Sequence, residues 1–81
     1  MCKYWINSNT GDVVTLTEEG HYYLLGDKIC EEEFKNLKGY VPIKAKKIEV
    51  IAQRGGLLYR SESAKKFWSK YKPTKKGGEK E

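Results

Sequence analysis

The chain has 81 residues and a formal net charge of +5, with 38% hydrophobic and 33% charged residues. A domain of this size buries roughly 60–65% of the surface of its unfolded chain, so we do not expect a deep catalytic cleft between two lobes. No apolar stretch approaches the roughly 20 residues of a membrane span, and the N-terminal segment has no signal-peptide core. These features favour a cytoplasmic protein that has no membrane contact.

Residues that bind metals or act as nucleophiles are sparse. Cys2 and Cys30 are too few for a disulfide framework, and we expect both to be free thiols in a reducing compartment. His21 is the one histidine, and no serine or cysteine is placed beside it by a catalytic signature, so it is interpreted as a surface or strand-edge residue. The glutamates at 31–33 point in different directions on a helix and favour a charged helix start over a catalytic pair. The sequence therefore predicts no metal, no cofactor and no enzymatic activity.

The first half of the chain predicts four short strands, at residues 2–6, 13–17, 21–25 and 28–30. Between the first two lies NSNTGD, a cluster of residues typical of turns. The second strand, VVTLT, is rich in β-branched side chains, which favour an extended backbone. Between the last two strands, Gly26 and Asp27 fit a two-residue hairpin loop of type II′.

The hydrophobic period then changes. Residues 31–38 predict a short helix, because Phe34 and Leu37 are three apart, three glutamates begin it and Gly39 follows it. We interpret GYVPIKAKK as a connector, since proline disfavours helix at the residue before it. KIEVIAQ alternates in polarity, which predicts a strand at 47–53, and LLYR predicts a return strand at 57–60 after a Gly55–Gly56 turn.

The last element is an amphipathic helix at 62–71. Ala64, Phe67, Trp68 and Tyr71 form one stripe at helical spacing, and Ser61 or Ser63 supplies the N-cap. Because a small domain needs its aromatic rings inside, we interpret the stripe as core in preference to an exposed ligand platform. The sequence thus predicts one small α+β domain over residues 1–72, built on an antiparallel sheet and two helices, and a disordered charged tail over 73–81.

Charge is divided unequally along the chain. Residues 1–37 carry three basic and seven acidic side chains, whereas residues 38–81 carry thirteen basic and four acidic ones. A polarised chain of this kind favours a polyanionic partner, DNA or RNA, although a lysine-rich surface that serves only solubility is the competing interpretation. Tyr40 and Tyr59 are candidates for stacking on unpaired bases, against the alternative that they are half-buried sheet residues. The expected phosphate-binding residues are Lys44, Lys46, Lys47, Arg54, Arg60, Lys65, Lys66 and Lys70.

A protein-binding module is the alternative function. Adjacent aromatic residues on a strand face opposite ways, so the pairs Tyr4–Trp5 and Tyr22–Tyr23 each place one ring outward, where such residues commonly anchor interfaces. The short chain and its Lys-, Glu- and Tyr-rich composition resemble small bacteriophage or mobile-element proteins. On this hypothesis the chain is an adaptor or inhibitor that engages a host or cellular protein.

Overall fold

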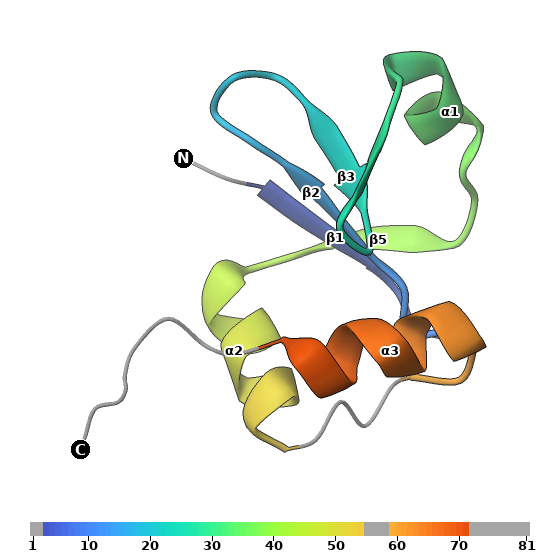
Figure 1. Ribbon diagram of the computed structural model, residues 1–81. Coiled ribbons are helices and arrows are strands. Elements are labelled where there is room, and N and C mark those ends of the chain that lie inside the picture. Colours follow the sequence, from blue (N-terminus) through green and yellow to red (C-terminus); the bar gives the residue numbers. More distant parts are fainter. Residues whose placement is uncertain (1–2, 55–58, 72–81) are drawn as a thin grey trace.

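The computed structural model describes residues 3–54 and 59–71, and it confirms the α+β class (Figure 1). Five strands form an antiparallel sheet in the order β4-β3-β2-β1-β5. Helices α2 and α3 lie on one side of this sheet and α1 on the other. In chain order the elements are β1 (Lys3–Asn7), β2 (Val13–Leu16), β3 (Tyr22–Leu24), β4 (Asp27–Ile29), α1 (Glu31–Asn36), β5 (Tyr40–Ile43), α2 (Ala45–Gln53) and α3 (Glu62–Lys70).

The four N-terminal strands and the helix after them form where the sequence predicts them, to within two residues at each end. One turn differs. Leu24 pairs with Asp27, so the loop of the β3–β4 hairpin is Leu25–Gly26 and not Gly26–Asp27. Both loop residues have positive φ, 53° for Leu25 and 93° for Gly26, as a type I′ turn requires. The hairpin register, set by pairing on both strands, therefore forces a leucine into a conformation that disfavours it.

The segment predicted as a connector is strand β5. It pairs with β1 on the side away from β2, with Ile43 opposite Tyr4 and Val41 opposite Ile6. Pro42 lacks a backbone N–H and is tolerated because β5 is an edge strand, where one side of the backbone has no neighbour in the sheet. Pro42, which led to the prediction of an irregular connector, is therefore compatible with a strand at the edge of the sheet.

The strand predicted at 47–53 is wrong, because these residues lie in helix α2. In the helix, Ile48, Ile51 and Ala52 share the side that packs on the core, with Ile48 only 1% exposed. The sequence of this segment fits two periods equally well: Ile48, Ile51 and Ala52 have the i, i+3, i+4 spacing of a helix, and Ile48, Val50 and Ala52 have the alternation of a strand. The return strand at 57–60 does not form at Tyr59 and Arg60. Its other half, the Gly55–Gly56 turn and the tail at 73–81 lie outside the described residues.

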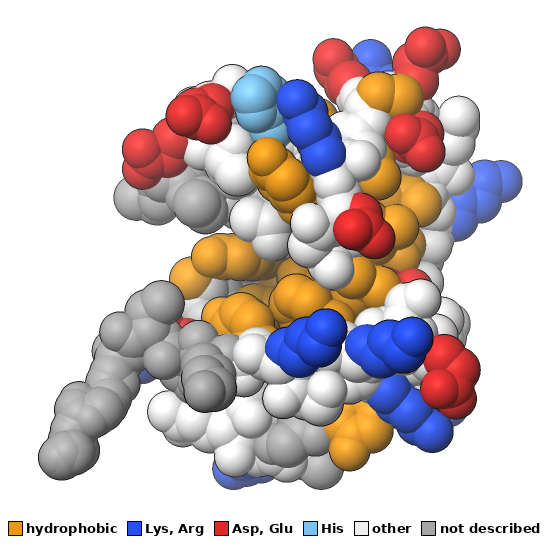
Figure 2. Space-filling model, viewed as in Figure 1, with side chains coloured by type: hydrophobic (Ala, Val, Ile, Leu, Met, Phe, Trp, Pro, Cys, Tyr) orange, Lys and Arg blue, Asp and Glu red, His pale blue; other side chains and the backbone are white. Residues whose placement is uncertain are grey.

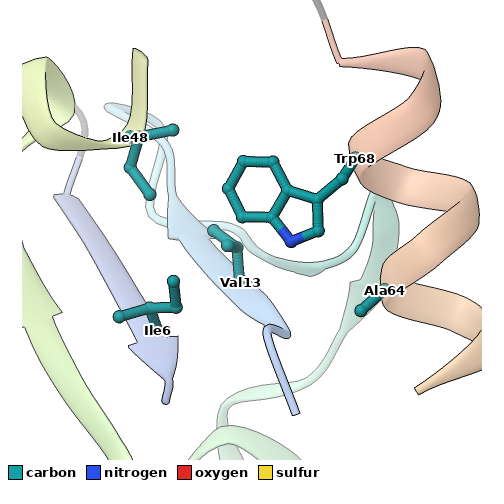
Figure 3. Packing of buried hydrophobic residues seen from close by; sticks show 5 residues of the cluster. All are labelled: Ile6, Val13, Ile48, Ala64 and Trp68. Atoms are coloured by element: carbon teal, nitrogen blue, oxygen red, sulfur yellow. The ribbon is translucent and has the colours of Figure 1, made fainter. Parts of the chain in front are cut away.

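Helix α3 confirms the aromatic stripe as core. Figure 3 shows Ile6 and Val13 of the sheet, Ile48 of α2, and Ala64 and Trp68 of α3 directed at one another. Trp68 is 3% exposed, and Phe67 and Tyr71 pack against the same cluster as half-buried residues. The rings predicted as an alternative ligand platform therefore close the hydrophobic core.

The opposite side of the sheet has a smaller aromatic cluster under α1. The Phe34 ring stacks on Tyr22 with centroids 4.2 Å apart, and it meets Trp5 edge-on at 4.8 Å. Val14, which is opposite Trp5 in the sheet, is fully buried. Since α1 is a short helix with no fully buried residue, these ring contacts are what hold it on the sheet.

Polar contacts attach the start of α3 to the β1–β2 turn. The Trp68 Nε1–H donates to the carbonyl of Gly11 at 2.7 Å in the buried core. Asp12 accepts from the Ser61 hydroxyl at 2.9 Å and from the Tyr40 hydroxyl at 3.3 Å. The Ser61 oxygen in turn accepts from the backbone N–H of Ala64 at 3.0 Å, which makes Ser61 the N-cap of α3. These bonds fix the orientation of α3 on the sheet.

Candidate nucleic-acid interface

The eight predicted phosphate-binding residues all lie on α2, on α3 or directly beside them, and all eight are exposed. We call this set the basic face. Three of its members begin α2, Arg54 ends α2, Arg60 precedes the N-cap of α3, and the remaining three lie within α3. Although the prediction of a strand at 47–53 was wrong, Lys44 and Arg54 lie at the two ends of the helix that these residues form. The members are Lys44, Lys46, Lys47, Arg54, Arg60, Lys65, Lys66 and Lys70.

Acidic residues are concentrated on the other part of the molecule. Seven of them lie within residues 3–43, whereas α2 and α3 contribute Glu49 and Glu62. In Figure 2 most of the acidic side chains in view surround α1 and the β2–β3 turn, and a row of Lys and Arg side chains follows α3. Among the described residues, the ion pair that joins the basic face to a carboxylate is Lys65–Glu62, at 3.7 Å and well exposed. An exposed pair of this kind is weak, so it leaves Lys65 able to exchange partners.

The start of α2 is positive for two reasons. Lys44 is its N-cap residue, Lys46 and Lys47 are in its first turn, and that turn has no acidic residue. The unpaired N–H groups of a helix start add a partial positive charge of their own. Lysines at this position destabilise a helix slightly, because like charges repel. The sequence therefore places positive charge where helix stability alone would favour a carboxylate.

A hollow of about 790 Å³ lies between the end of α2 and α3. Tyr59, which is 39% exposed, lies in it close to Lys65 and Lys66 of α3. Burial, followed by the nearby Tyr4 and Glu49, raises the pKa of Tyr71, which also contributes to the wall. Among the described residues, its lining is Ala52, Tyr59, Lys65, Lys66, Trp68, Ser69 and Tyr71.

A second depression, of about 520 Å³, runs between β5 and α2. Its floor is apolar, with Val41 53% exposed, and Lys44 and Lys47 border it. A neighbouring hollow of about 630 Å³ shares Pro42, Ile43 and Lys44 with it and extends to Lys3, Tyr4 and Trp5. We call the depression of about 520 Å³ the β5–α2 groove. Its described lining residues are Ile6, Val41, Pro42, Ile43, Lys44, Lys47 and Ile51.

The four aromatic residues of the alternative hypothesis are all half-buried. Trp5 and Tyr22 belong to the ring cluster under α1, and Tyr4 packs against the main core. Tyr23 is opposite Lys28 in the β3–β4 pair, so its side chain is on the opposite face of the sheet from Tyr22. The structure does not gather these four residues on one surface, but Tyr4 and Trp5 both reach the hollow beside the β5–α2 groove.

Sequence reasoning did not select Ser69, Tyr71 or Val41 as surface candidates. Tyr71 and Ser69 are in the predicted helix, where the stripe indicated only a core role for Tyr71. Val41 was in a predicted connector, so its exposure beside a groove had no sequence signal. Tyr40, a candidate for base stacking, instead donates its hydroxyl hydrogen to Asp12; burial and that carboxylate raise the pKa of Tyr40 to about 12.

The described residues offer little for metal or acid–base chemistry. Within 3–54 and 59–71 no three His, Cys, Asp or Glu side chains come together as metal ligands. The His21 Nδ1 lies 3.9 Å from a Glu19 oxygen at an exposed position, and Cys30 is an exposed free thiol. Over the same residues, no helix combines the length and the apolar character that crossing a membrane requires.

Comparison with protein-family models, with curated proteins and with solved structures gave no significant match for this chain, so its function has to be inferred from its own residues.

Proposed function

We propose that this protein binds nucleic acid through the basic face, chiefly by contacts between lysine ammonium groups and phosphates. The observation that supports the proposal most is the separation of charge between two layers. The α2–α3 layer carries the eight basic-face residues with Glu49 and Glu62, whereas the sheet, its turns and α1 carry seven acidic residues and four lysines. A face of this kind attracts a polyanion and orients it towards the helices.

The composition of the basic face indicates how such binding behaves. Six of its eight members are lysines, and the arginines are Arg54 and Arg60. Lysine is a strongly hydrated point charge and lacks the planar fork with which arginine reads guanine. We therefore expect low sequence specificity and an affinity that falls steeply as salt increases.

The test is fluorescence anisotropy with labelled duplex and single-stranded oligonucleotides at 50, 100 and 200 mM salt. The variant Lys65→Glu/Lys66→Glu removes two adjacent charges of the basic face. The control Lys28→Glu/Lys38→Glu makes the same change in net charge on the sheet layer. For a duplex, each lost phosphate contact lowers the salt slope by about 0.9 and the affinity about 8-fold at 0.1 M salt.

The basic-face variant is thus expected to bind a duplex about 60-fold more weakly at 0.1 M salt if both lysines contact phosphates. The control is expected to change affinity much less, through long-range charge alone. Equal losses in the two variants would show that net charge, and not the basic face, determines binding. Absence of micromolar binding by the wild-type protein at 50 mM salt would remove the proposal.

A second candidate function is docking of a protein segment in the β5–α2 groove. The observation that favours it is an apolar floor, with Val41 53% exposed, bordered by Lys44 and Lys47 and, within residues 3–54 and 59–71, lined by no acidic residue. This chemistry fits an amphipathic segment whose apolar residues are flanked by Asp or Glu. In a nuclease-treated pull-down, retention of a partner by the wild type and its loss with Val41→Glu would favour this function over nucleic-acid binding.

A further inference from the structure

We infer that the hollow between α2 and α3 receives an unpaired base on Tyr59, so that the preferred ligand of the basic face is a single-stranded nucleic acid. This inference rests on the proposed function and specifies its ligand class. The hollow has a volume of about 790 Å³, within the range of about 300–1,000 Å³ that is common for small-ligand sites. It adjoins Lys65 and Lys66, so a base in it and a phosphate on the basic face can belong to the same strand.

Tyr59 supplies the stacking surface. It is 39% exposed, unlike Trp68, which contributes to the same hollow but is 3% exposed and part of the core. The backbone directly after Tyr59 is fixed to the β1–β2 turn. The N–H of Arg60 donates to the Thr10 carbonyl at 2.8 Å, and the Ser61 side chain bonds to Asp12. An exposed ring next to a fixed backbone segment loses little conformational entropy when a base stacks on it.

The polar groups around the ring suit a nucleotide. Lys65 and Lys66 provide ammonium groups for the flanking phosphates. The Ser69 hydroxyl donates to the Lys66 carbonyl at 2.9 Å, which leaves its oxygen able to accept a hydrogen bond from a base amino group. Of the carboxylates in the part of the chain that the structure describes, Glu62 is paired with Lys65, and Glu49 acts on Tyr71 at the far wall.

A duplex cannot use such a site without opening. Within a duplex the faces of the bases are stacked on one another, and only their edges are accessible from the grooves. Tyr59 lies in a hollow between two helices, so it meets a base face only if that base leaves the stack. Stacking on an aromatic side chain depends little on which base is present, which agrees with the low sequence specificity expected of the basic face.

The experiment compares three 12-nucleotide ligands at 100 mM salt: labelled oligo(dT), an abasic strand of the same length and charge, and the dT·dA duplex, which carries about twice that charge. The full chain and the variants Tyr59→Ala and Tyr59→Phe are titrated with each. We expect the wild type to bind oligo(dT) more tightly than the abasic strand or the duplex. Tyr59→Ala is expected to weaken binding of oligo(dT) about 10-fold and to leave the other two ligands within 2-fold.

Tyr59→Phe keeps the ring and is expected to restore binding of oligo(dT) to near the wild-type value. Far-UV circular dichroism of each variant verifies the fold, which an exposed side chain is not expected to affect. Equal wild-type affinity for oligo(dT) and the abasic strand would overturn the inference, as would an equal loss for all three ligands in Tyr59→Ala. If the protein binds the duplex well but has no preference for bases, only this inference fails; if it binds none of the three, the proposed function fails as well.

Discussion

Replacement of Trp68 by phenylalanine tests whether the aromatic stripe of α3 is core. The indole is 3% exposed, and its N–H donates to the buried Gly11 carbonyl. Phenylalanine removes that donor, and an unsatisfied buried carbonyl costs about 1–3 kcal/mol. The smaller ring also leaves space in the core, which adds about 1 kcal/mol. We therefore expect the free energy of unfolding to fall by about 2–4 kcal/mol.

That loss is a large part of the stability of a domain of this size, which is about 4–12 kcal/mol. It corresponds to a decrease in Tm of roughly 10–25 °C. The measurement is urea unfolding at 25 °C followed by far-UV circular dichroism, which does not depend on tryptophan fluorescence.

Phe67→Leu is the control, because Phe67 is adjacent on the same helix but only half-buried and makes no such bond; we expect it to cost about 1 kcal/mol. A loss below about 1 kcal/mol for Trp68→Phe would refute the burial argument and return the stripe to consideration as a ligand surface.

Three further predictions concern the N-cap of α3, the β3–β4 turn and the bond between Tyr40 and Asp12. Ser61→Ala removes the N-cap of α3 and its bond to Asp12, and we expect it to lower the free energy of unfolding by about 1–2 kcal/mol. The control Ser63→Ala, at an exposed position in α3, should change this free energy by less than about 0.5 kcal/mol. Equal effects of the two variants would contradict the assignment of Ser61 as the cap. Leu25 has a positive φ of 53°, which asparagine adopts at lower cost, so Leu25→Asn should raise the free energy of unfolding by about 0.5–1 kcal/mol in the same urea assay. No gain in this variant would contradict the type I′ turn at Leu25–Gly26. The pKa of Tyr40 is about 12 in the folded protein against 10.0 as its ordinary value, so the folded state holds this proton longer and stability should decline as pH rises from 10 to 12. Tyr40→Phe should reduce that decline in alkaline unfolding curves, and an unchanged slope would speak against the bond to Asp12.

Much of the fold is determined locally. The turn cluster NSNTGD, the β-branched run at 13–16 and the polarity of residues 62–71 each admit one regular structure, so β1, β2 and α3 form where the sequence predicts them. The sequence offered Ser61 or Ser63 as the N-cap of α3, and the structure selects Ser61, whose side chain accepts from the backbone N–H of Ala64. The charge division along the chain was likewise visible in the sequence, because it depends only on the number and order of the charged residues.

Other features depend on contacts between distant residues. The apolar residues of 47–53 fit two periods equally well, and the helix is selected because Ile48, Ile51 and Ala52 then pack on Ile6 and Trp68. Leu25 takes a positive φ because pairing on both sides of the hairpin fixes the register, and the turn must follow.

The candidate site shows the same division. The sequence by itself determined which half of the chain is basic, since the number and order of lysines are properties of the chain. Only the tertiary structure decided that α2 and α3 share one side of the sheet, and thus that Lys65 and Lys66 adjoin Tyr59 and Ala52 around one hollow. The physical reason is that both helices bury their apolar stripes in a single core, which leaves their charged sides facing solvent together.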